Sequence, residues 1–247
     1  MYRIAEDAEV CQNYYLGARL RGASVRLCGN VALISCLMRH HRDSFDPATL
    51  TQYYAALNQA IAFLQKEAAR YGAPLSIKGY KFDVDTPPNA DPRDGYALIA
   101  DFLGKASMEE AQATYEKKYG VEEAPFLLVF DAKRRSFSWK QDRRPTNEIS
   151  VIFQEQNGFS WKCIAHELLH QFGAQDFYYP QQVKACAEAY LGESIMGARL
   201  AERVDDLTAY LVGWKSTVDE KTYRFLKDTM WMTDALHRQY AKAEWQG

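Results

Sequence analysis

The order of the predicted elements indicates an α+β fold, with a strand and a long helix before a group of strands and a mainly helical C-terminal part. Residues 31–38 form a nearly unbroken apolar run, which is typical of a buried strand. From Leu50 to Ala68, apolar residues recur at intervals of three and four, as on one face of an amphipathic helix. With 47% hydrophobic and 25% charged residues, the chain of 247 residues can form one substantial core.

Local signals bound the other elements. Asp46 and Pro47 are typical of the cap and first position of the long helix, and Gly72 ends it. Ser107 and Glu110 form a capping box that opens a second helix, ending near residue 119. The remaining pattern predicts strands near 75–82, 125–131, 135–140 and 148–154, a helix over 161–172, and a long helix from about 217 towards the C-terminus.

Two polar stretches interrupt this order. Residues 83–95 hold four aspartates, but their order fits no known calcium loop, so a solvated loop is expected. Residues 133–144 hold six lysines and arginines. A solvated hairpin edge is the first expectation for this basic stretch, and a preference for acidic substrates is the alternative.

Charge and hydropathy narrow the range of partners. The net charge is −2 and the pI about 6.2, so neither nucleic acid nor an anionic membrane is expected as a partner. The longest apolar run, 31–38, is too short to span a bilayer. The first twenty residues lack a signal-peptide core, and five irregularly spaced cysteines favour a reducing compartment. A cytoplasmic location is therefore expected, and a secreted one if a leader has been removed.

The run from His166 to Asp176 carries the chemistry of the chain and reads H-E-x-x-H-x-x-G-x-x-D. Two histidines four residues apart lie on one face of a helix and can bind one zinc ion. Glu167 lies beside them, placed to take a proton from water that zinc has made more acidic. Gly173 can end the helix in a left-handed turn, so that Asp176 returns as a third ligand. Three protein ligands leave one position open, as in catalytic zinc sites.

The extended motif, together with Glu193-Ser194-Ile195-Met196-Gly197, resembles the metzincin clan of zinc peptidases, and Asp176 resembles the third ligand of snapalysin-like members. The resemblance is specific over 160–197. It implies Met196 as the methionine of a turn beneath the metal, and a helix over 204–210. It further implies one domain over 1–247, with an upper subdomain over about 1–173 and a smaller, mainly helical lower subdomain over about 174–247. No tyrosine closely follows Met196, so the tyrosine ligand of astacin-like members is missing.

Several residues remain as alternatives. Glu202 resembles the glutamate ligand of gluzincins and is the rival third ligand. Tyr178, Tyr179 and Tyr190 are candidates to donate a hydrogen bond to an oxyanion. Cys28 faintly resembles a zinc-masking cysteine, but it is expected to pack as a small apolar residue, as is Cys163.

The expected activity is that of a zinc-dependent metallopeptidase with one catalytic Zn²⁺, most simply an endopeptidase acting on peptides or proteins. Its substrate is expected to add backbone hydrogen bonds along the edge of strand 148–154. Two other functions remain open: a zinc-dependent amidase acting on a small or non-peptide amide, and a non-catalytic binding protein that retains the fold.

Overall fold

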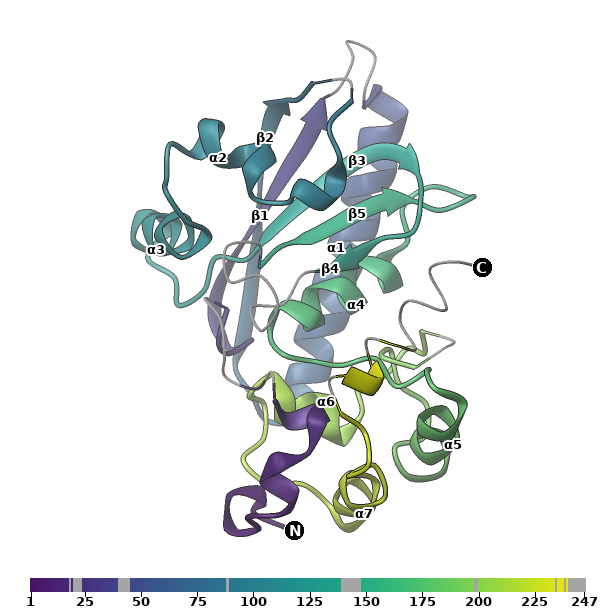
Figure 1. Cartoon of the computed structure of the whole chain (residues 1–247). Helices are drawn as coiled ribbons and strands as arrows, with labels where there is room; N and C mark the ends of the chain where they lie inside the picture. The colour runs from purple at the N-terminus through teal and green to yellow at the C-terminus, as the bar shows by residue number, and fades with distance from the viewer. Residues whose placement is uncertain are drawn as a thin grey trace.

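A five-stranded, mostly parallel sheet forms the upper half of the protein as drawn in Figure 1. The computed structural model describes residues 1–17, 19, 24–39, 45–87, 89–138, 148–197, 200–233, 235–237 and 239. Strand order is β2-β1-β3-β5-β4, and only β4 runs antiparallel to its neighbour. The strands are β1 (Gly29–Arg39), β2 (Leu75–Asp85), β3 (Phe126–Lys133), β4 (Phe137–Ser138) and β5 (Ser150–Gln154).

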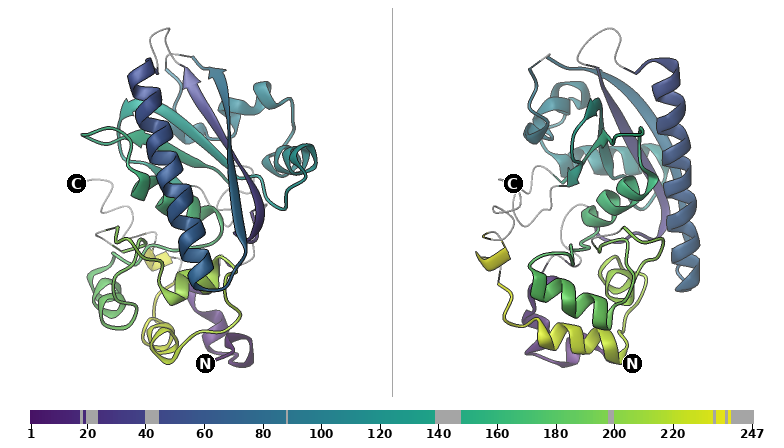
Figure 2. Two further views of the ribbon diagram at one scale, coloured as in Figure 1. Left: turned by 180° about the vertical axis from the view of Figure 1, so that it is seen from behind. Right: turned by 90° about the vertical axis from the view of Figure 1, so that its right-hand side faces the viewer.

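Helices cover both faces of this sheet and form the lower half of the chain (Figure 2). The α-helices are α1 (Pro47–Arg70), α2 (Ala97–Leu103), α3 (Met108–Tyr119), α4 (Trp161–Gln171), α5 (Gln181–Tyr190), α6 (Asp206–Leu211) and α7 (Glu220–Asp228). Short 3-10 turns are η1 (Ile4–Glu6), η2 (Val10–Gln12), η3 (Tyr14–Leu16) and η4 (Pro92–Asp94). None of the helices in the described ranges is long and apolar enough to cross a membrane.

Side chains of the central strand, β1, point alternately into two apolar clusters, one on each face of the sheet. Leu33 and Leu37 of β1 point to the face covered by α1 and α4, whereas Ile34 and Met38 point to the face covered by α2 and α3. The strand is buried on both sides, which explains its nearly continuous apolar sequence. The cluster on the α1 side continues into α6, α7 and the N-terminal turns, so the lower half shares its core with the sheet.

Long-range polar contacts attach the lower half to the rest. The Asn13 side chain donates to Leu226 O at 2.6 Å, which fixes the N-terminal turns against α7. At the end of α1, the buried Glu67 accepts a hydrogen bond from the N–H of Val204 at 2.8 Å. Arg70 donates both to Glu67 and to Val204 O. The N–H and the C=O of Val204, just before α6, are therefore both hydrogen-bonded to the end of α1.

The structure departs from the sequence prediction in several places, and α5 is one helix that no sequence pattern predicted. The stretch expected to be irregular after residue 83 continues β2 to Asp85, and the unpredicted α2 follows soon after. The second strand of the predicted basic hairpin, over 135–140, is formed at Phe137–Ser138, with residues 139–147 outside the described ranges. The long helix predicted from about 217 is interrupted: α7 ends at Asp228, where the Thr229 hydroxyl donates back to Phe225 O, and helical backbone returns at residues 235–237.

Candidate metal centre

Helix α4 carries the two histidines and ends in a tight reversal of the chain. The Ser160 side chain accepts a backbone N–H of the first turn. At the other end, the N–H of Gly173 donates to His170 O, and the N–H of Ala174 donates to Leu169 O. Gly173 has a φ of 94°, which lies in the region that residues with a Cβ rarely adopt. The chain therefore turns back directly after the second histidine.

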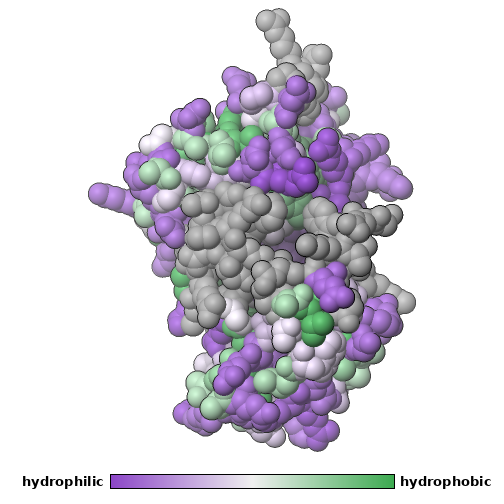
Figure 3. All heavy atoms as spheres, in the orientation of Figure 1, coloured by the Kyte–Doolittle hydropathy of each residue, from purple (hydrophilic) through white to green (hydrophobic). Residues whose placement is uncertain are grey.

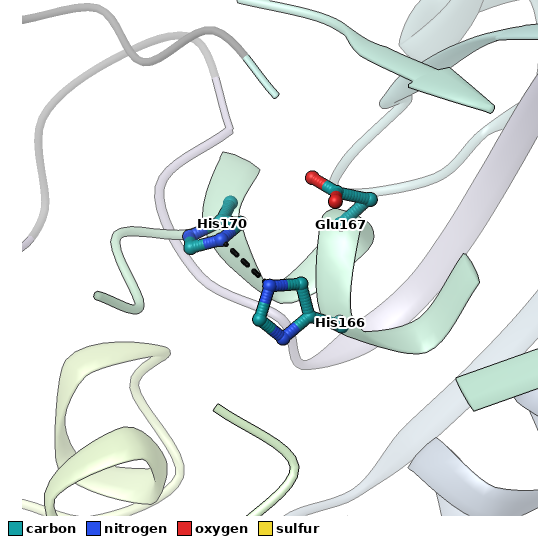
Figure 4. Close-up of side chains that lie close together, drawn as sticks. All are labelled: His166, Glu167 and His170. Atoms are coloured by element: carbon teal, nitrogen blue, oxygen red, sulfur yellow. Dashed lines mark hydrogen bonds between the residues drawn. The ribbon is translucent and has the colours of Figure 1, made fainter. Parts of the chain in front are cut away.

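Three side-chain atoms meet beside α4. Figure 4 shows the imidazoles of His166 and His170 facing each other, with their Nε2 atoms 3.1 Å apart. After the reversal, Asp176 brings Oδ1 to 3.2 Å from Nε2 of His166 and 3.1 Å from Nε2 of His170. Two ligand atoms about 2.0–2.1 Å from a tetrahedral zinc ion lie roughly 3.3 Å apart. The triangle formed by the two nitrogens and the oxygen therefore has the size of a zinc ligand set.

The backbone fixes which nitrogen of each ring faces this triangle. Nδ1 of His166 lies 2.9 Å from Ile195 O, and Nδ1 of His170 lies 2.9 Å from Ala174 O. A carbonyl oxygen only accepts, so each Nδ1 carries a proton and each neutral ring presents a lone pair at Nε2. While both rings are neutral, the buried Asp176 Oδ1 faces two lone pairs and accepts no hydrogen bond; it gains one only when a histidine Nε2 is protonated. A cation between these atoms removes their mutual repulsion, so the residues fit a divalent metal ion.

In the metal-free protein, the same contacts determine where a proton binds. Burial lowers the pKa of His166, but its hydrogen bond to Asp176 and the negative charge of Asp176 outweigh burial and raise this pKa to about 9. Burial raises the pKa of Asp176, yet the two histidines hold it well below its usual range. At neutral pH, a proton between His166 and Asp176 therefore takes the place of a cation.

Glu167 is buried beside the histidines and is held from the sheet. One of its carboxylate oxygens lies within 4.8 Å of the histidine ligand atoms, so His166, Glu167 and His170 form a group that could hold a metal ion. The Ser138 hydroxyl, on β4, donates to Glu167 Oε2 at 2.7 Å. Ser138 Oγ and Ser150 Oγ also lie 2.8 and 2.9 Å from Glu167 O. These hydroxyls orient both the carboxylate and the backbone of Glu167.

The turn around Met196 contacts both ends of the histidine–aspartate group. Its residue Ile195 accepts the hydrogen bond of His166, and Met196 O accepts the N–H of Phe177, next to Asp176. The buried side chain of Met196 has no exposed surface. Within the turn, the N–H of Met196 donates to Ser194 Oγ at 3.0 Å. A role for Met196 beneath a metal stays a prediction.

The alternative residues lie in other surroundings. Glu202 is 68% exposed and pairs with Lys162 Nζ at 3.1 Å on the surface, and it is not part of the group formed by His166, Glu167 and His170. Burial raises the pKa of the Cys28 thiol, whose charged neighbours are Arg26, Glu122 and Glu123 rather than the histidines. Cys163, on α4, has its pKa raised to about 12 by burial, which keeps it an unreactive thiol.

Of the three tyrosine candidates, Tyr178 lies at the site. Its hydroxyl donates to Asp176 Oδ2 at 3.0 Å and accepts a hydrogen bond from Arg135 Nη2 at 2.9 Å. Its ring also lies beside that of His166, with centroids 6.5 Å apart and the ring planes inclined by 29°. The Tyr179 ring packs on His237, and the Tyr190 hydroxyl donates to Asp228 between α5 and α7. The latter two are therefore structural contacts.

Sequence reasoning missed the hydroxyls of Ser138 and Ser150. In β5, Ser150 is a buried polar residue on the same face as the apolar Ile152, and that exception is the signal that could have found it; Ser138 lies in an ordinary alternation of polar and apolar residues and carries no such signal. The expected docking of a peptide along 148–154 is wrong, because β4 pairs with β5 at Val151 and Ser150. Ser136 Oγ then accepts the N–H of Phe153, so the outer side of β5 is already occupied.

Comparisons with solved structures give distant likenesses, among them two that cover most of this chain. No protein-family profile matches the sequence, and no curated protein matches it. A solved chaperone–substrate complex aligns with 84% of this chain at 11% identity and a TM-score of 0.44. Metalloproteinase-II from Bacteroides fragilis aligns with 90% of this chain at 9% identity and a TM-score of 0.41. The aligned parts cover 36% and 60% of those two chains, and at these TM-scores neither likeness carries an argument about function.

Proposed function

We propose that this protein is a zinc-dependent metallopeptidase, most simply an endopeptidase. The observation that carries the proposal is the convergence of His166 Nε2, His170 Nε2 and Asp176 Oδ1 at 3.1 to 3.2 Å, with both Nδ1 protons directed at backbone carbonyls. Two imidazoles and one carboxylate suit zinc and leave a fourth position open. We assign these three residues as ligands and Glu167, held by Ser138, as the general base.

Each residue of the site has a separate role in the proposed hydrolysis. A zinc ion bound there would supply Lewis acidity and lower the pKa of water towards about 7. Glu167 takes a proton from the attacking water and returns it to the leaving amine, and Ser138 holds its carboxylate in place. Tyr178 orients Asp176 by donating to its second oxygen, so that Oδ1 remains turned towards the histidines. Its single hydroxyl proton is used in that hydrogen bond, so Tyr178 would donate to a developing oxyanion only after releasing Asp176.

An extended peptide is the substrate that the sheet edge favours. β4 is the last strand of the sheet among the described residues, and Ser138 joins its edge to Glu167. A strand added beside β4 would place its backbone next to the candidate base. We place the division between an upper part, about 1–173, and a lower part, about 174–247, at the reversal after Gly173. The N-terminal turns η1 to η3 are an exception to these bounds, because they pack against α7 in the lower part.

The test combines metal content with cleavage of a mixed peptide library by wild-type protein and Glu167→Gln. The substitution removes the base and keeps nearly the same shape, so zinc should bind stoichiometrically to both proteins. Turnover of the variant should fall by at least about a hundredfold. Equal turnover by the two zinc-loaded proteins would refute the role of Glu167. Cleavage of small amides but of no peptide would make the protein an amidase, and absence of stoichiometric metal would make it a binding protein.

A further inference from the structure

An open pocket lies beside the start of β4, on the sheet face opposite α4. Its volume is about 580 Å³. It is lined by the loop and turn that follow β2 and by residues around β4, namely Asn89, Ala90, Asp91, Pro92, Arg93, Arg134, Arg135, Phe137 and Phe153. Figure 3 shows hydrophilic side chains gathered on the upper part of this face, over η4 and the neighbouring strand ends. Three arginines and one aspartate give the lining a positive balance.

The arginines of the pocket differ in whether a carboxylate already compensates their charge. Arg93 is already neutralised, because its guanidinium forms three hydrogen bonds with the Asp91 carboxylate at 2.6 to 3.0 Å. Arg135 donates to the neutral hydroxyl of Tyr178. Arg134 is exposed and forms no ion pair within the part of the chain that the structure describes, although its charge contributes, after that of Arg93, to the lowered pKa of Asp91. The pocket therefore has at least one cationic side chain that an anionic group can pair with.

The base of the pocket is apolar. Phe153 is buried, Phe137 is half-buried beside it with ring centroids 6.4 Å apart, and Pro92 is buried at the start of η4. An occupant that fits both parts has an aliphatic stem and an anionic head, as a glutamate or aspartate side chain does. A free inorganic anion would use the arginines and leave the aromatic base without contact.

β4 connects this pocket to the candidate base. Phe137 lines the pocket, and the next residue, Ser138, donates to Glu167 Oε2 from the other face of the strand. Side chains of a peptide beside β4 would alternate between the same two faces. We propose that this pocket binds an acidic side chain of a peptide substrate, within about two residues of the bond that faces Glu167. This inference rests on the proposed function, and it assigns that function a preference for acidic peptides.

The experiment measures binding separately from cleavage. Fluorescent peptide pools, identical except that Glu, Gln or Lys occupies one position at a time, are titrated against zinc-loaded Glu167→Gln protein at low salt. The decisive variant is Arg134→Glu in that background. Lys133→Glu is the matched control, because Lys133 is an exposed neighbour that carries the same charge and does not line the pocket.

At one position or two, the Glu pool should bind about fivefold more tightly than the Gln pool, which is the scale of a partly exposed ion pair. Arg134→Glu should abolish this preference or shift it to Lys, while Lys133→Glu should change it by less than about twofold. Raising the salt concentration should weaken the preference. Equal binding of the Glu and Gln pools, binding of no pool, or equal effects of the two variants would overturn the proposal. A preserved preference in a wild-type protein that cleaves no peptide would instead refute the proposed function alone.

Discussion

Two serine hydroxyls hold Glu167 against the sheet through different atoms, so their removal should have different consequences. Ser138 Oγ donates to the carboxylate at 2.7 Å, whereas Ser150 Oγ contacts only the backbone oxygen, at 2.9 Å. The two residues face each other across the β4–β5 pair, and their Oγ atoms lie 2.8 Å apart. Ser138→Ala and Ser150→Ala therefore remove the same atom from adjacent strands and form a matched pair.

Ser150 should matter chiefly for stability. It is fully buried, and its hydroxyl accepts a hydrogen bond from Gln171 Nε2 at 2.7 Å besides contacting Glu167 O. Loss of a buried partner costs about 1–3 kcal/mol, and Gln171 keeps its second acceptor, Phe126 O, at 2.9 Å. We expect Ser150→Ala to lower the free energy of unfolding by about 2 kcal/mol and Tm by roughly 5 °C.

Ser138 should matter chiefly for activity. It is half-buried, so water can replace its contacts with the backbone, and the loss of stability should stay below about 1 kcal/mol. A hydrogen bond to a charged group contributes about 1.5–3 kcal/mol. If that interaction holds the base in its reactive position, its loss lowers kcat/KM by about tenfold to a hundredfold.

Thermal unfolding, zinc affinity and peptide cleavage are measured for both variants beside wild type. Zinc affinity should be unchanged in both, because neither serine contacts a ligand side chain. The reasoning fails if Ser150→Ala loses as much activity as Ser138→Ala while both remain folded and zinc-loaded. It also fails if Ser138→Ala retains wild-type kcat/KM.

Two further predictions concern the ligands and a buried carboxyl group. Asp176→Ala should weaken zinc binding by at least about tenfold, and Glu202→Ala should leave it unchanged. Competition with a chelator measures both affinities, and the reverse result would favour the gluzincin-like ligand set. Burial raises the pKa of Glu123 from 4.5 to about 7, although it accepts the N–H groups of Val25 and Arg26. Because the folded pKa is the higher one, stability from the neutral acid is complete below about pH 4.5 and is lost as pH rises through 7. Glu123→Gln keeps the acceptor without the titration, so between pH 5 and 8 the variant should lose up to about 2 kcal/mol less than wild type in urea unfolding, and equal losses would contradict this.

The elements that could be predicted from the sequence depend on contacts close along the chain. The spacing of His166, Glu167 and His170 needs only one helix, and Gly173 needs only the next turn. The long α1 could be predicted equally well, because the spacing of its apolar residues and its start at Asp46–Pro47 are local signals. The five-stranded, mostly parallel sheet could be predicted only as a mixed α+β arrangement, since strand order depends on pairing between distant segments.

What could not be predicted depends on contacts across the fold. Ser138 reaches Glu167 over 29 positions, and Arg135 reaches Tyr178 over 43. α2 was missed because it is short, follows a Pro- and Asp-rich stretch and buries only Ile99. The break in the C-terminal helix was missed because apolar residues such as Met232 stay buried between α7 and the helical residues 235–237, so the apolar pattern does not mark the interruption.

The geometry of the candidate site therefore depends on a segment that the motif does not contain. His166 can present Nε2 to a metal only because Ile195 O takes its other proton, and Ile195 is held by the turn in which Ser194 Oγ accepts the N–H of Met196. Ser194 donates to the buried Asp205 at 2.5 Å, and Asp205 caps α6. The next residue back, Val204, is held by Glu67 at the end of α1. A continuous set of hydrogen bonds thus joins the longest helix of the upper half to the first histidine. The H-E-x-x-H helix specifies which atoms are available, and the folded C-terminal segment specifies their tautomer and direction.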